Sequence, residues 1–125
     1  MNKYRIAIIG AGHRAGAHDR EQLEKGQAPG SHAWAYQQVE ACEFVAAADP
    51  NTENLQRLCA LYDIPGSYTD YRQMLAEVQP DIVSICTVTR PRAEIIVYAA
   101  EHGVKAIYAE KALCASMAEA DKILA

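Results

Sequence analysis

The sequence lacks the features that would place the protein in a membrane, in an export pathway or on nucleic acid. No apolar run reaches the ~18 residues of a membrane-spanning helix. The N-terminus enters a strand-like pattern at once, without the apolar core and cleavage site of a signal peptide. Lys and Arg number 12 against 16 Asp and Glu, so the net charge is -4 and there is no basic surplus for phosphate binding. We therefore expect a cytoplasmic protein that binds neither membranes nor nucleic acid.

The sequence also lacks the spacing of a metal site or a disulfide framework. Its four cysteines include no C-x-x-C pair, so we expect free thiols that are buried or half-buried: Cys42, Cys59, Cys86 and Cys114. A metal site built from the histidines at positions 13, 18, 32 and 102 is disfavoured. His13 and His18 are five residues apart and would not share a helix face.

Apolar strand-like runs alternate with helical patterns along the 125 residues, which is enough chain for one domain with a core. The expected strands are residues 4–9, 43–48, a short piece near 67–68, 81–86 and 104–109. The helical patterns between them include a stripe capped by Asn51 and a terminal helix opened by the capping box Ser116-x-x-Glu119. Strands joined through helices pair in parallel, and little alternation within them indicates helices on both faces. We predict an α/β fold: a doubly wound, five-stranded Rossmann sheet of order 3-2-1-4-5 over residues 1–125.

One segment breaks this rhythm. Residues 21–31 are polar and contain two Gly and one Pro, and the helical pattern resumes only at His32. We interpret the segment as a loop inserted into the first crossover. Its length favours a surface excursion, and a lid over a cofactor is the alternative.

The stretch "IIGAGHRAG" provides the first candidate site. Gly10 and Gly12 stand where the first strand should turn into a helix, and Ala15 takes the third position of a G-x-G-x-x-G/A pattern. A dinucleotide pyrophosphate needs close backbone approach, which a side chain at Gly12 would block. The N-terminus of the following helix would supply free N–H groups. A plain tight turn is the alternative.

Asp49 ends the second expected strand, where a carboxylate can accept hydrogen bonds from the adenosine ribose and repel a 2′-phosphate. It follows Gly10 by more than the usual ~20 residues, and the inserted segment accounts for the excess. The alternative is an Asp-Pro turn or a helix cap. The ribose role predicts NAD as the cofactor in preference to NADP.

Two further stretches fall at the same carboxyl edge of the expected sheet. Thr87 and Val88 follow the fourth strand and are placed to line the nicotinamide half of the cleft. Arg90 and Arg92 come next, and we expect them to be solvated on a helix start; contact with phosphates or a substrate carboxylate is the alternative. Glu110 and Lys111 end the fifth strand, where a lysine can assist the proton transfer that accompanies hydride transfer.

In this order, the stretches "GAGHRAGAH", "AAADPN", "DIVSICT" and "YAEKAL" resemble the N-terminal half of the Gfo/Idh/MocA family of NAD(P)-dependent oxidoreductases. The resemblance covers nearly the whole chain. It implies that Lys111 is the catalytic-site lysine and that Glu110 shapes the nicotinamide pocket. It also implies that the remaining cofactor-site residues are Gly10, Gly12, His13, Arg14, Ala15, Asp49, Thr87 and Val88.

The chain departs from the family pattern at several positions. Ala112 replaces the proline of the family's E-K-P, Thr87-Val88-Thr89 stands for its T-P-N, and Arg92 replaces a common histidine. Because the first crossover is lengthened, either His18 or His32 can match the histidine of the family's first motif.

By resemblance, the expected function is hydride transfer between NAD and a sugar, a cyclitol or a similar polyhydroxy or carbonyl compound. Family enzymes carry a second α/β domain that binds substrate, and that domain is absent from these 125 residues. We therefore expect the chain alone to bind cofactor but turn over little, and to associate with itself through uncovered surface. The competing hypothesis is a stand-alone nucleotide-binding or regulatory module without catalysis.

Overall fold

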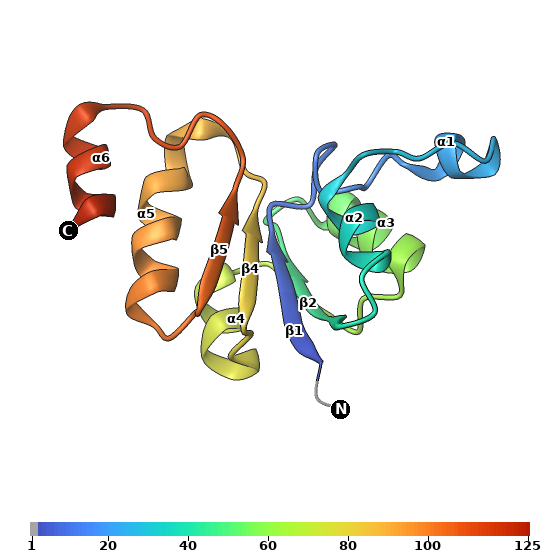
Figure 1. Cartoon of the computed structure of the whole chain (residues 1–125), viewed down its shortest axis with the longest axis horizontal. Coiled ribbons are helices and arrows are strands. Elements are labelled where there is room, and N and C mark those ends of the chain that lie inside the picture. Colours follow the sequence, from blue (N-terminus) through green and yellow to red (C-terminus); the bar gives the residue numbers. More distant parts are fainter. Residues whose placement is uncertain (1–2) are drawn as a thin grey trace.

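The computed structural model describes residues 3–125, which form a five-stranded parallel sheet (Figure 1). Its order is β3-β2-β1-β4-β5, as the sequence predicts. The strands are β1 (Tyr4–Ile9), β2 (Cys42–Ala48), β3 (Gly66–Tyr68), β4 (Ile82–Ile85) and β5 (Ala106–Ala109). All four neighbouring pairs are parallel, so the carboxyl ends of the strands share one edge.

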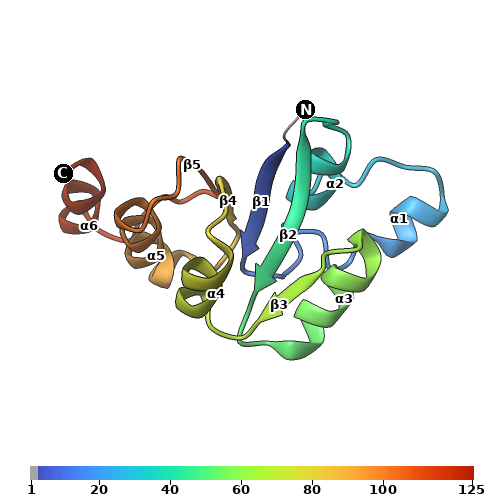
Figure 2. The same ribbon diagram turned by 90° about the horizontal axis from the view of Figure 1, so that it is seen from below.

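Six helices connect and flank the strands. They are α1 (Arg20–Glu24), α2 (His32–Gln37), α3 (Thr52–Tyr62), α4 (Tyr71–Val78), α5 (Thr89–Glu101) and α6 (Met117–Leu124). Helices α2 and α3 cover one face of the sheet, and α4 and α5 cover the other (Figures 1 and 2). Helix α6 packs on α5, and α1 projects from the far side of the molecule. No helix within residues 3–125 has the length and apolarity to cross a membrane.

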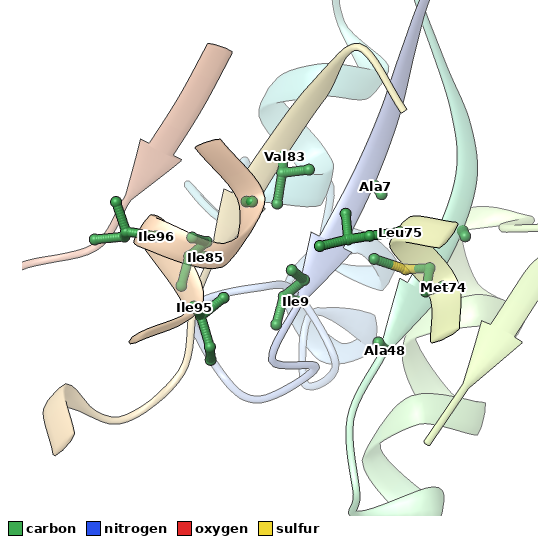
Figure 3. Packing of buried hydrophobic residues seen from close by; sticks show 11 residues of the cluster. Ala7, Ile9, Ala48, Met74, Leu75, Val83, Ile85, Ile95 and Ile96 are labelled. Carbon is green, nitrogen blue, oxygen red and sulfur yellow. The ribbon is translucent and has the colours of Figure 1, made fainter. Parts of the chain in front are cut away.

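Alternate side chains of the central strands build two separate cores. On the α4 and α5 side, Ile9 and Ile85 pack with Met74 and Ile95 (Figure 3). On the α2 and α3 side, Ile8 packs against the buried face of α3, which includes Leu58. Successive residues of a strand point to opposite faces, so neighbours such as Ile8 and Ile9 serve different cores. The strands lack polar alternation because both faces are buried.

The predicted helix caps are present. The Asn51 side chain accepts a hydrogen bond from the Asn54 N–H at 3.1 Å, which begins α3. Ser116 Oγ accepts from the Glu119 N–H at 3.2 Å and begins α6. Glu119 bends back to accept from the Ala115 N–H at 2.7 Å, one residue before the N–H that a standard capping box would use. The four cysteines are free and half-buried, as expected.

The first crossover differs from the prediction in two ways. The segment 21–31 is not a loop throughout, because α1 occupies Arg20–Glu24, supported by an exposed pair of Glu21 and Lys25 at 2.7 Å. No helix follows the glycine motif either: residues 12–18 form turns, and Gly16 has a φ of +130°. A residue at that φ interrupts a right-handed helix, so regular helix begins only at Arg20, with α1.

Strand β5 begins at Ala106, two residues later than expected. The N–H groups of Lys105 and Ala106 both donate to the Asp81 carbonyl, at 3.0 and 3.3 Å, before the regular ladder with β4 begins. The strand is therefore short, and it ends immediately before Glu110.

Candidate functional site

A cavity of about 650 Å³ opens at the carboxyl edge of the sheet, beside the ends of β1, β2 and β4. Of the predicted site residues, Gly10, Gly12, Asp49, Thr87 and Val88 line it. A larger hollow of about 720 Å³ between α1 and α3 touches none of the predicted site residues. The carboxyl edge is where ligands of doubly wound sheets bind, so the first cavity is the candidate site.

The two leading glycines are required for different reasons. A Cβ added to Gly10 would lie 2.7 Å from the Thr87 nitrogen, and its φ is +91°. Gly10 therefore lets the ends of β1 and β4 approach each other. A Cβ on Gly12 would meet no atom within 4 Å, although Gly12 lines the cavity. Its backbone faces open space, which fits the close approach of a pyrophosphate.

Asp49 holds the glycine turn from the end of β2. Its Oδ2 accepts a hydrogen bond from the Ala11 N–H at 2.6 Å, and its Oδ1 accepts from the Asn51 N–H at 2.7 Å. The second bond forms the Asp-Pro turn that the sequence left as an alternative. The helix-cap alternative is wrong, because Asn51 caps α3. The carboxylate nonetheless lines the cavity, where a ribose would meet it.

His13, Arg14 and Ala15 do not line the cavity. Ala15 is fully buried in the core under α2 and α3. His13 and His18 are exposed, and their rings stack with centroids 5.6 Å apart. The expectation that they would lie apart assumed a helix, and the turns of residues 12–18 bring them together. Within residues 3–125, no group of three or more His, Cys, Asp or Glu side chains is arranged to hold a metal ion.

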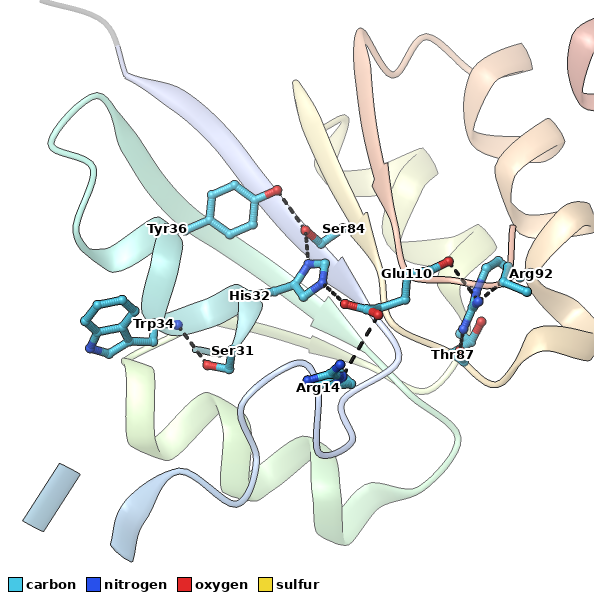
Figure 4. Close-up of polar contacts among 10 residues, drawn as sticks. Arg14, Ser31, His32, Trp34, Tyr36, Ser84, Thr87, Arg92 and Glu110 are labelled. Carbon is cyan, nitrogen blue, oxygen red and sulfur yellow. Dashed lines mark hydrogen bonds and ion pairs between the residues drawn. The ribbon is translucent and has the colours of Figure 1, made fainter. Parts of the chain in front are cut away.

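Glu110 and Lys111 are not among the residues that line the cavity, and Glu110 lies in a separate polar cluster (Figure 4). Its carboxylate contacts His32 Nε2 at 2.8 Å and lies 4.0 Å from Arg14 Nε. His32 Nδ1 contacts Ser84 Oγ at 2.9 Å, and Tyr36 Oη contacts the same oxygen at 2.7 Å. His32, rather than His18, therefore stands against Glu110.

Sequence reasoning missed Tyr36 and Ser84 in this cluster. Tyr36 follows His32 by four residues, so a helix places both side chains on one face, and that spacing was a usable signal. Ser84 gave no such signal, because a serine inside a buried strand has several common explanations.

The hydrogen bond from His32 is the main reason that the pKa of the Glu110 carboxyl is lowered from its ordinary value. Burial works in the opposite direction and is outweighed. Burial also raises the pKa of the nearby Cys86 thiol to about 12, with the Glu110 charge adding to the effect. Glu110 is therefore an anion near neutral pH, while Cys86 keeps its proton and is a poor nucleophile.

Arg92 corrects an expectation of the sequence analysis. Only 3% of it is exposed, whereas Arg90 is exposed as expected. The Arg92 guanidinium donates to the Glu110 carbonyl at 2.8 Å and also to the carbonyls of Thr87 and Ala112. Because α5 begins at Thr89, Arg92 lies in its first turn beside the ends of β4 and β5. It joins the loop after β4 to the loop after β5, and in the second loop it binds the carbonyls on both sides of Lys111, whose own side chain is exposed.

Replacing Arg92 with Met is expected to lower the free energy of unfolding by about 2 kcal/mol, because buried carbonyls lose a charged donor. Arg90→Met is the matched control on the same turn and should change it by less than about 0.5 kcal/mol. Urea denaturation measures both. Equal effects in the two variants would contradict the buried role of Arg92.

The family comparison bears on this geometry. The Gfo/Idh/MocA model, an oxidoreductase family with an NAD-binding Rossmann fold, matches residues 4–125. The chain belongs to this family. It is an NAD(P)-binding Rossmann domain of the kind that these NAD(P)-dependent dehydrogenases contain.

Individual Gfo/Idh/MocA relatives agree with this assignment. The chain is 30% identical over 95 residues to the D-apiose dehydrogenase of Paraburkholderia graminis. These 95 residues are 76% of this chain and 25% of that protein. An oxidoreductase of Agrobacterium radiobacter, solved with NAD+, L-tartaric acid and magnesium, superposes with a TM-score of 0.79 at 23% identity. The myo-inositol 2-dehydrogenase of Lactobacillus plantarum superposes with a TM-score of 0.78 at 23% identity. Both structural matches cover 98% of this chain and 32% of the other, and they show the shared fold. The chain thus spans a quarter to a third of the length of these relatives.

Proposed function

We propose that this chain is the NAD-binding part of a dehydrogenase that transfers a hydride between NAD and a sugar, a cyclitol or a similar polyhydroxy or carbonyl compound. The observation that carries the proposal is Gly12, whose backbone faces open space in the cavity at the carboxyl edge of the sheet. Membership of an oxidoreductase family supports it. Two relatives are named for polyhydroxy substrates, D-apiose and myo-inositol, which supports the substrate class.

Gly12 and Asp49 are assigned to the phosphate and ribose of the cofactor. The backbone at Gly12 approaches the pyrophosphate, and Asp49 exchanges its bond to Ala11 for the ribose hydroxyls. The charges around the cavity favour NAD over NADP. Asp49 and Asp70 line it, while the guanidinium of Arg72 is paired with Glu94 at 2.6 Å and stacks over the Tyr71 ring. Two carboxylates and an engaged arginine disfavour a 2′-phosphate.

Lys111 is assigned to the proton that accompanies hydride transfer. The bound nicotinamide would supply the hydride chemistry. Thr87 and Val88, which line the cavity, are assigned to its side of the cleft, and Glu110 is assigned to shape it. Lys111 is the second residue after β5, and Arg92 binds the carbonyls of its two neighbours, Glu110 and Ala112. A lysine there can reach a substrate hydroxyl, where its neutral amine can take the hydroxyl proton and its ammonium can return one to a carbonyl substrate. We infer that a second domain supplies the rest of the substrate site, and that the working protein is a homo-oligomer.

Calorimetric titration of the 125-residue chain with NADH and NADPH tests the cofactor assignment. We expect NADH to bind more tightly than NADPH. Gly12→Val should weaken NADH binding at least about 100-fold, because the pyrophosphate loses several charge-assisted backbone hydrogen bonds. Asp49→Asn should narrow the preference for NADH by about tenfold, because one repelling charge is removed.

Thermal unfolding of each variant is the control, since a Cβ at position 12 meets no atom within 4 Å. Two results would contradict the proposal. One is wild-type protein that binds neither cofactor at millimolar concentration. The other is a folded Gly12→Val variant that binds NADH as tightly as wild type.

A further inference from the structure

Four side chains form an unbroken line of hydrogen bonds from Tyr36 to Glu110. Tyr36 contacts Ser84 at 2.7 Å, Ser84 contacts His32 at 2.9 Å, and His32 contacts Glu110 at 2.8 Å. Two of the four lie on α2, one lies in β4, and Glu110 directly follows β5 (Figure 4). The line therefore links the helix over the sheet to the loop that carries Lys111.

The donors and acceptors of this line can be ordered from one end. An ionised Glu110 only accepts, so His32 Nε2 must carry a proton and donate it. In a neutral imidazole the other nitrogen, Nδ1, is then an acceptor, so the Ser84 hydroxyl donates to it. Ser84 Oγ in turn accepts from the Tyr36 hydroxyl, whose pKa is raised by burial. Every group in the line is satisfied with a proton on His32 Nε2.

The surroundings fit this arrangement. His32 is 9% exposed and Ser84 is fully buried. The Tyr108 ring packs edge-on against the imidazole, with centroids 4.7 Å apart. The charged and titratable groups around Glu110, apart from His32, are Arg14 at 4.0 Å and the half-buried Cys86. The backbone N–H of Lys111 also donates to the Glu110 carboxylate. Arg92 binds the Glu110 carbonyl, so the main chain and the side chain of Glu110 are held independently.

We propose that His32 is a positioning residue that holds the Glu110 carboxylate in one orientation next to Lys111, with Ser84 and Tyr36 completing the hydrogen bonds of the imidazole. This proposal rests on the proposed function, because a fixed orientation of Glu110 matters only if Glu110 and Lys111 serve the nicotinamide side of a cofactor site. The second carboxylate oxygen, which His32 does not contact, faces Arg14. A fixed Glu110 keeps the nicotinamide side of the cleft formed before a ligand arrives.

Nitrogen-15 NMR of the histidine rings in the whole chain tests the tautomer directly, with His32→Gln used to assign the signal. At pH 7 we expect His32 to carry a proton on Nε2, the nitrogen that faces Glu110. Glu110→Ala removes the acceptor that fixes this proton, so the Nδ1-protonated tautomer should appear, whereas Ser84→Ala should leave Nε2 protonated. An Nε2 without a proton in wild type, or a tautomer unaffected by Glu110→Ala, would overturn the proposal.

Cofactor affinity tests the positioning role with a conservative pair of variants. A glutamine at position 32 can still donate to Glu110 and should bind NADH within about threefold of wild type, whereas His32→Leu should bind about tenfold more weakly. Equal affinities of the Leu variant and wild type would overturn the role. If wild type binds no NADH, the proposed function fails, and the NMR result still decides whether the hydrogen-bond line exists.

The pH dependence of stability provides a second readout. Because the pKa of Glu110 is lowered in the folded protein, its stabilisation is present above the ordinary carboxyl value of 4.5 and is lost as the pH falls through the folded value. Wild type should therefore unfold at a higher temperature than Glu110→Gln at pH 7, and the gap should close below pH 4.5. A gap that is constant with pH would show that His32 does not hold an ionised Glu110.

Discussion

Gly10→Ala is expected to lower the free energy of unfolding by about 3 kcal/mol, the sum of a left-handed backbone penalty and a packing clash. The φ of Gly10 is +91°, where an L side chain is strained. The added Cβ would lie 2.7 Å from the Thr87 nitrogen and 2.8 Å from the Cys86 carbonyl carbon. Both atoms belong to the backbone just after β4, so they cannot yield as a flexible side chain would. Strands β1 and β4 would have to separate at the edge that forms the cavity.

Gly12→Ala is the matched control for this substitution. It adds the same methyl group two residues away, at a normal φ and with no atom within 4 Å. Its free energy of unfolding should stay within about 0.5 kcal/mol of wild type. Urea denaturation monitored by Trp34 fluorescence and by circular dichroism measures both variants. If the two were equally stable, the tight approach of Gly10 to Thr87 would be refuted.

Asp19→Ala is expected to lower the free energy of unfolding by about 3 kcal/mol, because it leaves buried hydroxyl groups without a hydrogen-bond acceptor. Asp19 is 4% exposed and its Oδ2 accepts from Ser31 Oγ at 2.5 Å and from the Tyr62 hydroxyl. Burial and the bond to Asp19 raise the pKa of Tyr62, so its hydroxyl stays protonated as a donor. These contacts fasten the turns after the glycine motif to α2 and α3.

A double-mutant cycle separates this contact from a general loss of packing. Tyr62→Phe alone removes one donor, and the Asp19→Ala, Tyr62→Phe double variant leaves fewer groups unsatisfied than the sum of the single changes suggests. We expect a coupling energy above about 1 kcal/mol, measured by chemical denaturation of all four proteins. Strict additivity of the two single effects would show that the contact contributes nothing of its own.

The parallel sheet and its strand order could be predicted from the sequence because they depend on local patterns. Apolar runs without alternation, separated by helical stripes, require a sheet covered on both faces, and the right-handed crossover rule leaves few orders. The glycine turn, Asp49 and the loop after β4 fall together at one cavity because parallel strands share a carboxyl edge. That much of the candidate site follows from residue order and the direction of the strands.

Other features were decided only by the tertiary structure. Arg92 was expected in solvent, but it is buried against three main-chain carbonyls that belong to the loops after β4 and β5. The turns after Gly12 replaced a predicted helix, which placed His32 against Glu110 and left His18 on the surface. The partnership of Ser84 with Tyr36 joins residues 48 positions apart.

The division has a physical reason. Hydrophobic periodicity and strand direction are properties of consecutive residues, so the sequence alone determined the layers, the strand order and the edge where a ligand would lie. A buried polar group is satisfied by whichever donor or acceptor the packed chain brings to it, and that partner is usually distant in sequence. The partners of Arg92, His32 and Asp19 were therefore decided only when the helices packed on the sheet.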